Sequence, residues 1–345
     1  MDKNISYVGK QVYIGIDVHK SKYAIAVVSA GTNVHKNGGM PASPWELISF
    51  IGRRFQGAQV HTVYEAGFSG FDLHRALEEA GITNTVVNPA SIESSPNNKV
   101  KTDKLDAVNM ANKLSKGDLK CIRIPSREEE SKRSLSRTRE QLVESKKRFL
   151  IQISMKLHAF GLYPRNIKRL TIKLVKEIID CPEISKEVTM AITSLVSVHE
   201  HISEEISKLE EELGKQAQED KNERLYRSVP GVGFISARIL SNELGDLSQF
   251  SSEKKLSSFV GLTPTEHSSS DKVRRGRISR QGSARLRCIL NQVSWVAITK
   301  DAQLRSFYDR LKVRCGGKKA IVAVSRKLLC RMHHMFKFQE EYKFA

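Results

Sequence analysis

A β-hairpin is predicted at residues 11–29, and this segment constrains the fold more than any other. Two short runs of β-favouring residues lie there on either side of the polar turn His19–Lys22. A third strand is expected near Val34. The chain therefore begins as an antiparallel sheet.

Strands alternate with helices beyond the hairpin. Apolar residues recur at helical spacing in 45–55 and 71–80, and Gly81 ends the second pattern. Segments 61–64 and 84–88 have strand character. The order β-β-β-α-β-α-β-α predicts a mixed sheet flanked by helices, which is the arrangement of an α/β RNase H-like fold.

The stretch 126–220 shows almost no strand signal. Its second half has residues spaced by three and four positions: Ile192, Leu195, His199, Ile202, Ile206, Leu209 and Leu213. This a/d pattern predicts coiled-coil packing, in which the polar His199 is tolerated or sets the register. Pro164 and Pro182 interrupt the stretch, so we expect antiparallel helices suited either to self-association or to internal packing.

The character of the chain changes again after Leu225. Residues 229–233, Val-Pro-Gly-Val-Gly, lie between two helical patterns, and a Ser-, Lys- and Arg-rich loop runs from Thr263 to Gly282 before helices resume. The Gly-rich turn resembles that of helix-hairpin-helix modules, whose backbone N–H groups can hold a phosphate. A plain helix–helix turn is the alternative. We expect three domains: 1–125, α/β; 126–221, a helical coiled-coil connector; and 222–345, mostly α.

The charge of the chain predicts a polyanionic partner. Among its 345 residues, 57 are Lys or Arg and 38 are Asp or Glu, which gives a formal net charge of +19. Each cation placed on a phosphate releases condensed counterions, so nucleic acid is favoured over an anionic membrane surface. A solvated basic surface is the alternative.

Several features argue against a secreted or membrane protein. No apolar run approaches the ~18 to 20 residues of a membrane helix, and residues 1–10 lack the apolar core of a signal peptide. The five cysteines are odd in number and form no CxxC pair. We expect a reduced, cytosolic chain without a membrane partner.

Four carboxylates suggest a metal site. Asp17 and Glu65 each end an apolar run, and Asp103 and Asp106 are three residues apart at the start of a helical pattern, hence on one face. Hard divalent cations take oxygen ligands and can drive phosphodiester chemistry in pairs. As alternatives, these residues form turns, strand ends and helix caps. His19, near Asp17, either contacts this carboxylate without binding the metal itself or is an ordinary histidine of the turn.

Motifs along nearly the whole chain resemble those of one transposase family. They are GIDVHK around Asp17, YEAG around Glu65, NPA at 88–90, KTDKLDA around Asp103 and Asp106, SVPGVG at 228–233, FVGLTP at 259–264 and GRISRQGSARLR at 276–287. In this order and spacing they resemble the DEDD-motif transposases of the insertion-sequence 110 family, in its 1111 branch. These are RNA-guided recombinases.

The resemblance implies a site and its partners. Asp17, Glu65, Asp103 and Asp106 would hold Mg²⁺, or Mn²⁺, in a RuvC-like domain, and a serine of the C-terminal domain would attack DNA covalently. Motif matching places that nucleophile at Ser269; the family usually has Gly next, where Ser270 stands here, so a neighbouring serine is the alternative. The implied partners are donor and target DNA, a structured noncoding guide RNA and further copies of the chain, in the prokaryotic cytoplasm at the nucleoid.

A basic cluster flanks the predicted nucleophile. Its members are Lys272, Arg274, Arg275, Arg277, Arg280, Arg285 and Arg287. Cations there can bind phosphates and offset charge that develops at the scissile one, whereas a solvated basic face is the alternative. The stretches Lys146–Arg148 and Arg326–Arg331 are candidate RNA contacts, with DNA as the alternative because nothing local separates the two.

Two other functions remain open from the residues alone. One is a carboxylate nuclease such as a junction resolvase, in which water attacks the phosphate. The other is a non-catalytic nucleic-acid-binding protein that keeps the fold for assembly.

Overall fold

A computed structural model describes residues 6–89, 103–266 and 275–344 of the chain. The chain divides into two compact units, Met1–Pro125 and Ser126–Ala345. Each unit has hydrophobic cores of its own.

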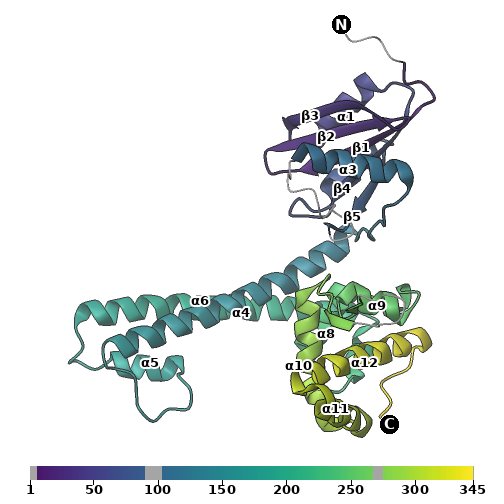
Figure 1. The fold of residues 1–345 in the computed structure, drawn as a ribbon. Helices are drawn as coiled ribbons and strands as arrows, with labels where there is room; N and C mark the ends of the chain where they lie inside the picture. Colours follow the sequence, from purple (N-terminus) through teal and green to yellow (C-terminus); the bar gives the residue numbers. More distant parts are fainter. Residues whose placement is uncertain (1–5, 90–102, 267–274, 345) are drawn as a thin grey trace. The chain divides into compact units, whose positions relative to one another are not determined.

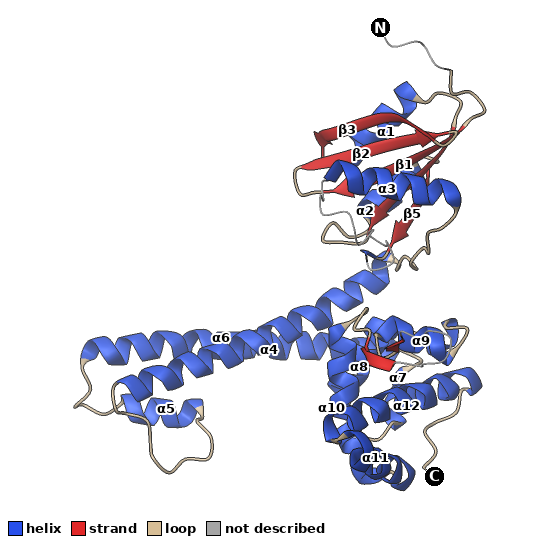
Figure 2. Ribbon diagram, in the orientation of Figure 1, coloured by secondary structure: helices blue, strands red, loops and turns tan. Residues whose placement is uncertain are grey.

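The first unit is a five-stranded sheet with helices on both faces (Figures 1 and 2). Its elements are β1 (Gln11–Val18), β2 (Lys22–Ser29), β3 (Thr32–Pro41), α1 (Pro44–Arg54), β4 (Gln59–Glu65), α2 (Asp72–Glu79), β5 (Thr83–Val87) and α3 (Asp103–Lys116). This is the predicted β-β-β-α-β-α-β-α order, so the RNase H-like fold class is confirmed.

The sheet places β1 at its centre, in the order β3-β2-β1-β4-β5. β1 is antiparallel to β2 and parallel to β4, and β4 is parallel to β5. The predicted polar turn closes the β1–β2 hairpin, because the N–H of His19 donates to the carbonyl oxygen of Lys22 at 3.0 Å. The central position of β1 brings its carboxyl end next to that of β4.

The two faces of the sheet carry different helices. Ile14 and Ile16 of β1 pack with Leu47 of α1 and Leu77 of α2 in one core. On the opposite face, α3 packs on β1 and β2, and its Met110 belongs to a smaller core with residues of β4 and β5. Side chains that alternate along β1 therefore face α1 and α2 or face α3.

The second unit begins with two long helices that lie side by side (Figure 1). They are α4 (Arg127–Ala159) and α6 (Lys186–Glu219), with the short α5 (Ile172–Ile179) between them in the chain. α4 starts at a capping box in which Ser126 and Glu129 satisfy each other's backbone N–H groups.

The predicted seam of α6 is buried at every seventh residue: Ile192, His199, Ile206 and Leu213. α6 packs along α4 of the same chain. Of the two roles left open for the seam, internal packing therefore accounts for these residues. Self-association stays a prediction.

The remaining helices surround one large core. They are α7 (Glu223–Ser228), α8 (Phe234–Leu244), η2 (Leu247–Gln249), α9 (Glu253–Val260), α10 (Ala284–Lys300), α11 (Ala302–Cys315) and α12 (Gly317–Phe338), with the two strands β6 (Pro264–Glu266) and β7 (Arg275–Ile278) between α9 and α10. Arg238 of α8 is buried in this part of the chain and is neutralised by Asp220 and Glu223. The separation of α7 to α12 from α4 to α6 as a third domain stays a prediction.

In the described segments, no helix combines the length and the apolarity that crossing a membrane requires.

Candidate active site

Asp17 and Glu65 lie at the carboxyl ends of two neighbouring parallel strands. In the β1–β4 ladder Ile16 pairs with Tyr64, so the residues that follow them, Asp17 and Glu65, stand side by side. Ile16 and Tyr64 point into the core beneath α1 and α2. Because side chains alternate along a strand, Asp17 and Glu65 are on the opposite face, which α3 covers.

α3 meets the centre of the sheet at Gly15. A Cβ on Gly15 would overlap the carbonyl oxygen of Ala107 and lie 2.8 Å from the backbone nitrogen of Ala111, so helix and strand touch main chain to main chain. Asp106 is next to this contact and is half-buried. Asp103 begins α3, but its side chain lies outside the described residues. The acidic end of α3 therefore belongs to the same face of the sheet as Asp17.

His19 contacts Asp17 directly. Its Nε2 is 3.2 Å from Oδ2 of the carboxylate, and its side chain is 41% exposed against 24% for Asp17. The imidazole thus approaches the carboxylate from its solvent side. The orientation of Asp17 by His19 from outside a metal site stays a prediction.

The donor chemistry of these residues fits a hard divalent cation, because carboxylate oxygens are the ligands that Mg²⁺ and Mn²⁺ prefer. Within the described residues, no three His, Cys, Asp or Glu side chains are grouped so that they could hold a metal ion. The structure pairs Asp17 with Glu65 and brings the helix of Asp106 to their face. It does not by itself place three ligands around one ion.

A two-stranded ribbon frames the segment predicted to carry the nucleophile. β6 and β7 are antiparallel, and Glu266 at the end of β6 pairs with Arg275 at the start of β7. The described residues on either side of segment 267–274 are therefore neighbours. Of the predicted nucleophile and the predicted basic cluster, Ser269, Lys272, Arg274 and the side chain of Arg275 lie outside the described residues.

The other arginines of the basic cluster fall into two groups. Arg277 and Arg280 are exposed, where they can meet a phosphate. Arg287 instead donates to two main-chain carbonyl oxygens, each at 3.0 Å, and Arg285 forms ion pairs with carboxylates of its own unit. Arg277 and Arg280 of the cluster therefore lie at the surface, whereas Arg285 and Arg287 stabilise contacts within their own unit.

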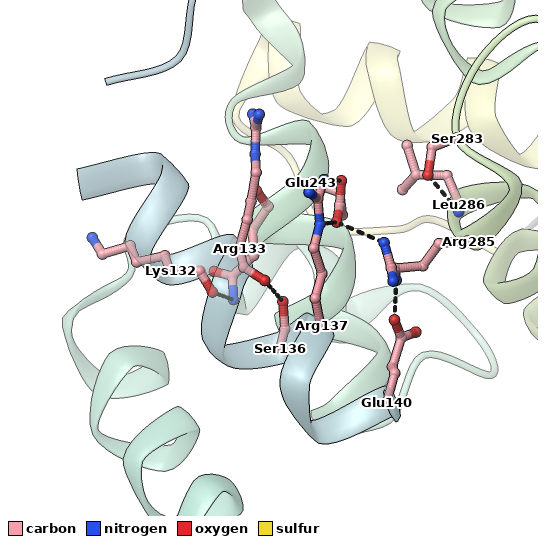
Figure 3. A network of polar contacts seen from close by, with 10 residues as sticks. Lys132, Arg133, Ser136, Arg137, Glu140, Glu243, Ser283, Arg285 and Leu286 are labelled. Atoms are coloured by element: carbon pink, nitrogen blue, oxygen red, sulfur yellow. Dashed lines mark hydrogen bonds and ion pairs between the residues drawn. The ribbon is translucent and has the colours of Figure 1, made fainter. Parts of the chain in front are cut away.

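Arg285 belongs to a polar network that joins α4, α8 and α10 (Figure 3). Arg137 donates two hydrogen bonds to Glu243, at 2.7 and 2.9 Å, and Arg285 contacts both Glu243, at 3.5 Å, and Glu140. Hydrogen bonding to Glu243, whose side chain is only 5% exposed, raises the pKa of Arg137. This network leaves no signal in the sequence, because Arg137 and Glu243 are 106 positions apart and no periodic pattern links them.

The Val-Pro-Gly-Val-Gly turn connects α7 to α8, as predicted. Gly231 has a φ of +89°, and a Cβ there would lie 2.7 Å from Cβ of Val296 and 2.9 Å from the carbonyl oxygen of Val293. Glycine is therefore required for the turn to pack on α10. Gly233 then begins α8 as its N-cap. Phosphate binding by this turn stays a prediction.

Two protein-family models match the chain. The model described as "Transposase IS116/IS110/IS902 family" matches residues 223–309. The model of the IS110 DEDD transposases, described as "Transposase", matches residues 14–161. The second range contains Asp17, Glu65 and α3, and the first contains segment 267–274.

Similar proteins match the chain over much of its length. The y4qE protein of Sinorhizobium fredii is 29% identical over 299 residues, which cover 83% of this chain and 72% of that protein. The transposase of insertion sequence element IS1111A from Coxiella burnetii is 28% identical over 223 residues, or 63% of this chain and 60% of its own. The transposase of element IS1533 from Leptospira borgpetersenii is 24% identical and covers 95% and 96%.

The matched ranges fall in both units of the chain. The strand ends with Asp17 and Glu65 lie in the range of the DEDD transposase model, residues 14–161, and the ribbon around segment 267–274 lies in the other matched range, residues 223–309. The chain is therefore a transposase, an enzyme that cuts and transfers DNA, and its two matched ranges are similar to the two parts of the IS110-type transposases.

Proposed function

We propose that this transposase cuts and rejoins DNA with a divalent-metal site of Asp17, Glu65, Asp103 and Asp106 and with Ser269 as its nucleophile. The observation that carries the proposal is the side-by-side placement of Asp17 and Glu65 on the face that α3 covers. Two carboxylates at adjoining strand ends, with the acidic start of a helix over them, suit phosphodiester chemistry.

The carboxylates have the role of holding Mg²⁺ or Mn²⁺. A bound divalent ion would lower the pKa of an attacking hydroxyl and offset the negative charge of the phosphate. His19 orients the carboxylate of Asp17 through their 3.2 Å contact. Arg277 and Arg280, which are exposed and follow the predicted nucleophile in the chain, bind the phosphates on either side of the scissile bond.

The covalent step exchanges one phosphodiester for another. The Oγ of Ser269 bonds to phosphorus while the bond from phosphorus to one deoxyribose oxygen breaks. The serine hydroxyl gives its proton to a base, because it is a weak nucleophile at neutral pH, and the leaving oxygen takes up a proton. The reverse reaction, with a hydroxyl end of a second strand, rejoins the DNA.

The partners follow from the family resemblance and the charge. We propose that donor and target DNA are chosen by a structured noncoding RNA and that the active form is a homo-oligomer in the bacterial cytoplasm, at the nucleoid. A net charge of +19 supports binding of more than one nucleic-acid strand.

The test is a search for the covalent adduct. The full chain is incubated with Mg²⁺, end-labelled DNA carrying the element's ends and target, and the adjacent noncoding RNA, and the products are separated on a denaturing gel. We expect label that migrates with protein and maps to Ser269 by mass spectrometry. The adduct should be lost in Asp17→Asn and in Ser269→Ala.

A matched control is Glu79→Gln, which neutralises an exposed carboxylate of α2, on the other face of the sheet. This variant should form the adduct as the wild type does. Cleavage without an adduct, unchanged in Ser269→Ala, would instead show a carboxylate nuclease in which water attacks. An adduct on Ser268 or Ser270 would correct the register.

A further inference from the structure

A groove of about 580 Å³ lies between α4, α6 and the residues that lead into α5. Its charged lining consists of four cations, Arg139, Lys146, Lys147 and Arg169, and one carboxylate, Glu210. None of these residues belongs to the carboxylate or serine sites. The groove is therefore a separate, cationic feature of the helical part of the chain.

The cations of the groove are not equally neutralised. Arg139 donates twice to Glu210, at 2.8 and 2.6 Å, and Lys147 is 3.9 Å from a carboxylate of its own helix. Within the described part of the chain, neither Lys146 nor Arg169 forms an ion pair. The two groove cations that no described carboxylate neutralises are therefore Lys146 of α4 and Arg169 of the loop before α5. Because they come from different elements that line the same groove, one bound anion can contact both.

The floor of the groove is apolar. Leu150 of α4, Ile172 of α5 and Ile206 of α6 line it, and Leu170, only 7% exposed, lies beside them. Ser207 of α6 also lines the groove, and its side chain is exposed to solvent. A simple anion site needs no such surface, because a phosphate or carboxylate gains nothing from apolar contact.

His199 is the polar group set into this floor. Its side chain is 93% buried, since only 7% is exposed, and its Nδ1 has no hydrogen-bond partner among the described residues. Burial, and then the charge of Lys146, lower the pKa of His199, against the opposite effect of Glu200, so the ring is neutral at neutral pH. An unpartnered buried nitrogen costs free energy, which a polar ligand group entering the groove offsets.

We propose that this groove binds an unpaired nucleotide of a nucleic-acid strand, with its phosphate on Lys146 and Arg169 and its base against the apolar floor beside His199. Proteins bind single strands by combining cations that contact the backbone with ring side chains, His among them, on which a base stacks. The volume falls within the range of about 300–1,000 Å³ for small-ligand pockets.

The inference goes beyond the proposed catalytic function and does not depend on it. RNA and DNA strands share the chemistry that the groove offers, so the experiment compares them. Binding is measured by fluorescence anisotropy on the full chain, in EDTA so that no strand is cut, with single-stranded RNA, single-stranded DNA and duplex DNA of one sequence. A failed catalytic proposal would leave this measurement unaffected.

The first pair of variants tests the cations. Lys146→Ala/Arg169→Ala removes the two uncompensated charges, and Lys173→Ala/Lys215→Ala removes two exposed lysines of α5 and α6 outside the groove. We expect the slope of log K against log salt for single strands to fall by about 0.7 for each lost phosphate contact in the groove variant. The control should keep the wild-type slope.

The second pair tests the floor without changing charge. Ser207→Trp fills the groove, and Ser194→Trp places the same side chain at another exposed serine of α6 whose hydroxyl also donates to the carbonyl four residues earlier. We expect Ser207→Trp to weaken single-strand binding about tenfold and Ser194→Trp to leave it unchanged. A larger loss for RNA than for DNA would assign the groove to RNA, and the converse to DNA.

Any of three results would overturn the proposal. The first is equal loss in the groove and control variants, which would reduce the groove to general surface charge. The second is a Ser207→Trp protein that binds both single strands as tightly as the wild type, and the third is a Ser207→Trp protein that loses duplex binding to the same extent as single-strand binding.

Discussion

Gly15 of β1 lies directly against the carbonyl oxygen of Ala107 in α3, so that strand and helix meet without an intervening side chain. Asp17 follows Gly15 on the same face of β1, and Asp106 precedes Ala107 in α3. The spacing between the proposed ligands on β1 and on α3 therefore depends on this one close approach.

Gly15→Ala is expected to force α3 away from the sheet. Overpacking of this kind costs about 1–3 kcal/mol, and the displaced acids of α3 should also reduce DNA cleavage. Urea denaturation and a cleavage gel measure the two effects. In the control Gly52→Ala of α1, nothing lies within 4 Å of the added Cβ, so stability should rise by about 0.5–1 kcal/mol. Wild-type stability and cleavage in Gly15→Ala would contradict the close contact.

A divalent metal is expected to stabilise the fold before any DNA is present. An ion that binds only the folded protein adds about 2.7 kcal/mol when its concentration is a hundred times its Kd. Millimolar Mg²⁺ or Mn²⁺ should therefore raise the Tm of the wild type, and Asp17→Asn should abolish most of that shift. Equal shifts in the wild type and in Asp17→Asn would place the metal elsewhere.

Arg285 and Arg277 are expected to behave differently, although both belong to the predicted basic cluster. Arg285→Ala leaves Glu140 and the buried Glu243 without one of their partners, which should cost about 1–3 kcal/mol of stability. Arg277→Ala removes an exposed side chain, so stability should change by less than about 0.5 kcal/mol while DNA binding weakens. Equal loss of stability in both variants would refute this division.

His199 is expected to make the protein sensitive to acid. Burial lowers its folded pKa below the ordinary value of 6.5, so protonation favours the unfolded chain. Stability should therefore decrease as the pH falls from above 6.5 through the lower folded pKa. Between about pH 8 and 5, the Tm of wild type should fall further than that of His199→Gln. Parallel curves for the two proteins would show that His199 does not contribute.

The order of strands and helices in the first unit could be predicted because each element leaves a local trace. The turn at His19–Lys22 and the helical spacing in 45–55 depend on residues within one or two turns of chain. The positions of Asp17 and Glu65 at the ends of apolar runs were visible for the same reason. Their adjacency required the parallel pairing of β1 with β4.

The contacts of the second unit could not be predicted in this way. Arg285 looked like a phosphate ligand in the sequence, whereas its carboxylate partners are 145 and 42 residues away. The groove around His199 likewise combines side chains of α4, α6 and the loop before α5. Nothing in a local pattern specifies which distant side chains will meet.

Local patterns in the chain were enough to predict the RNase H-like order of elements, the basic character of the protein, the acidic strand ends and the transposase motifs. The contact of α3 with Gly15, the ion pairs of Arg285 within its own unit and the groove shared by Lys146 and Arg169 became visible only in the folded chain. Hydrophobic periodicity and turn chemistry act within a few residues, whereas packing and ion pairing depend on where distant segments come together.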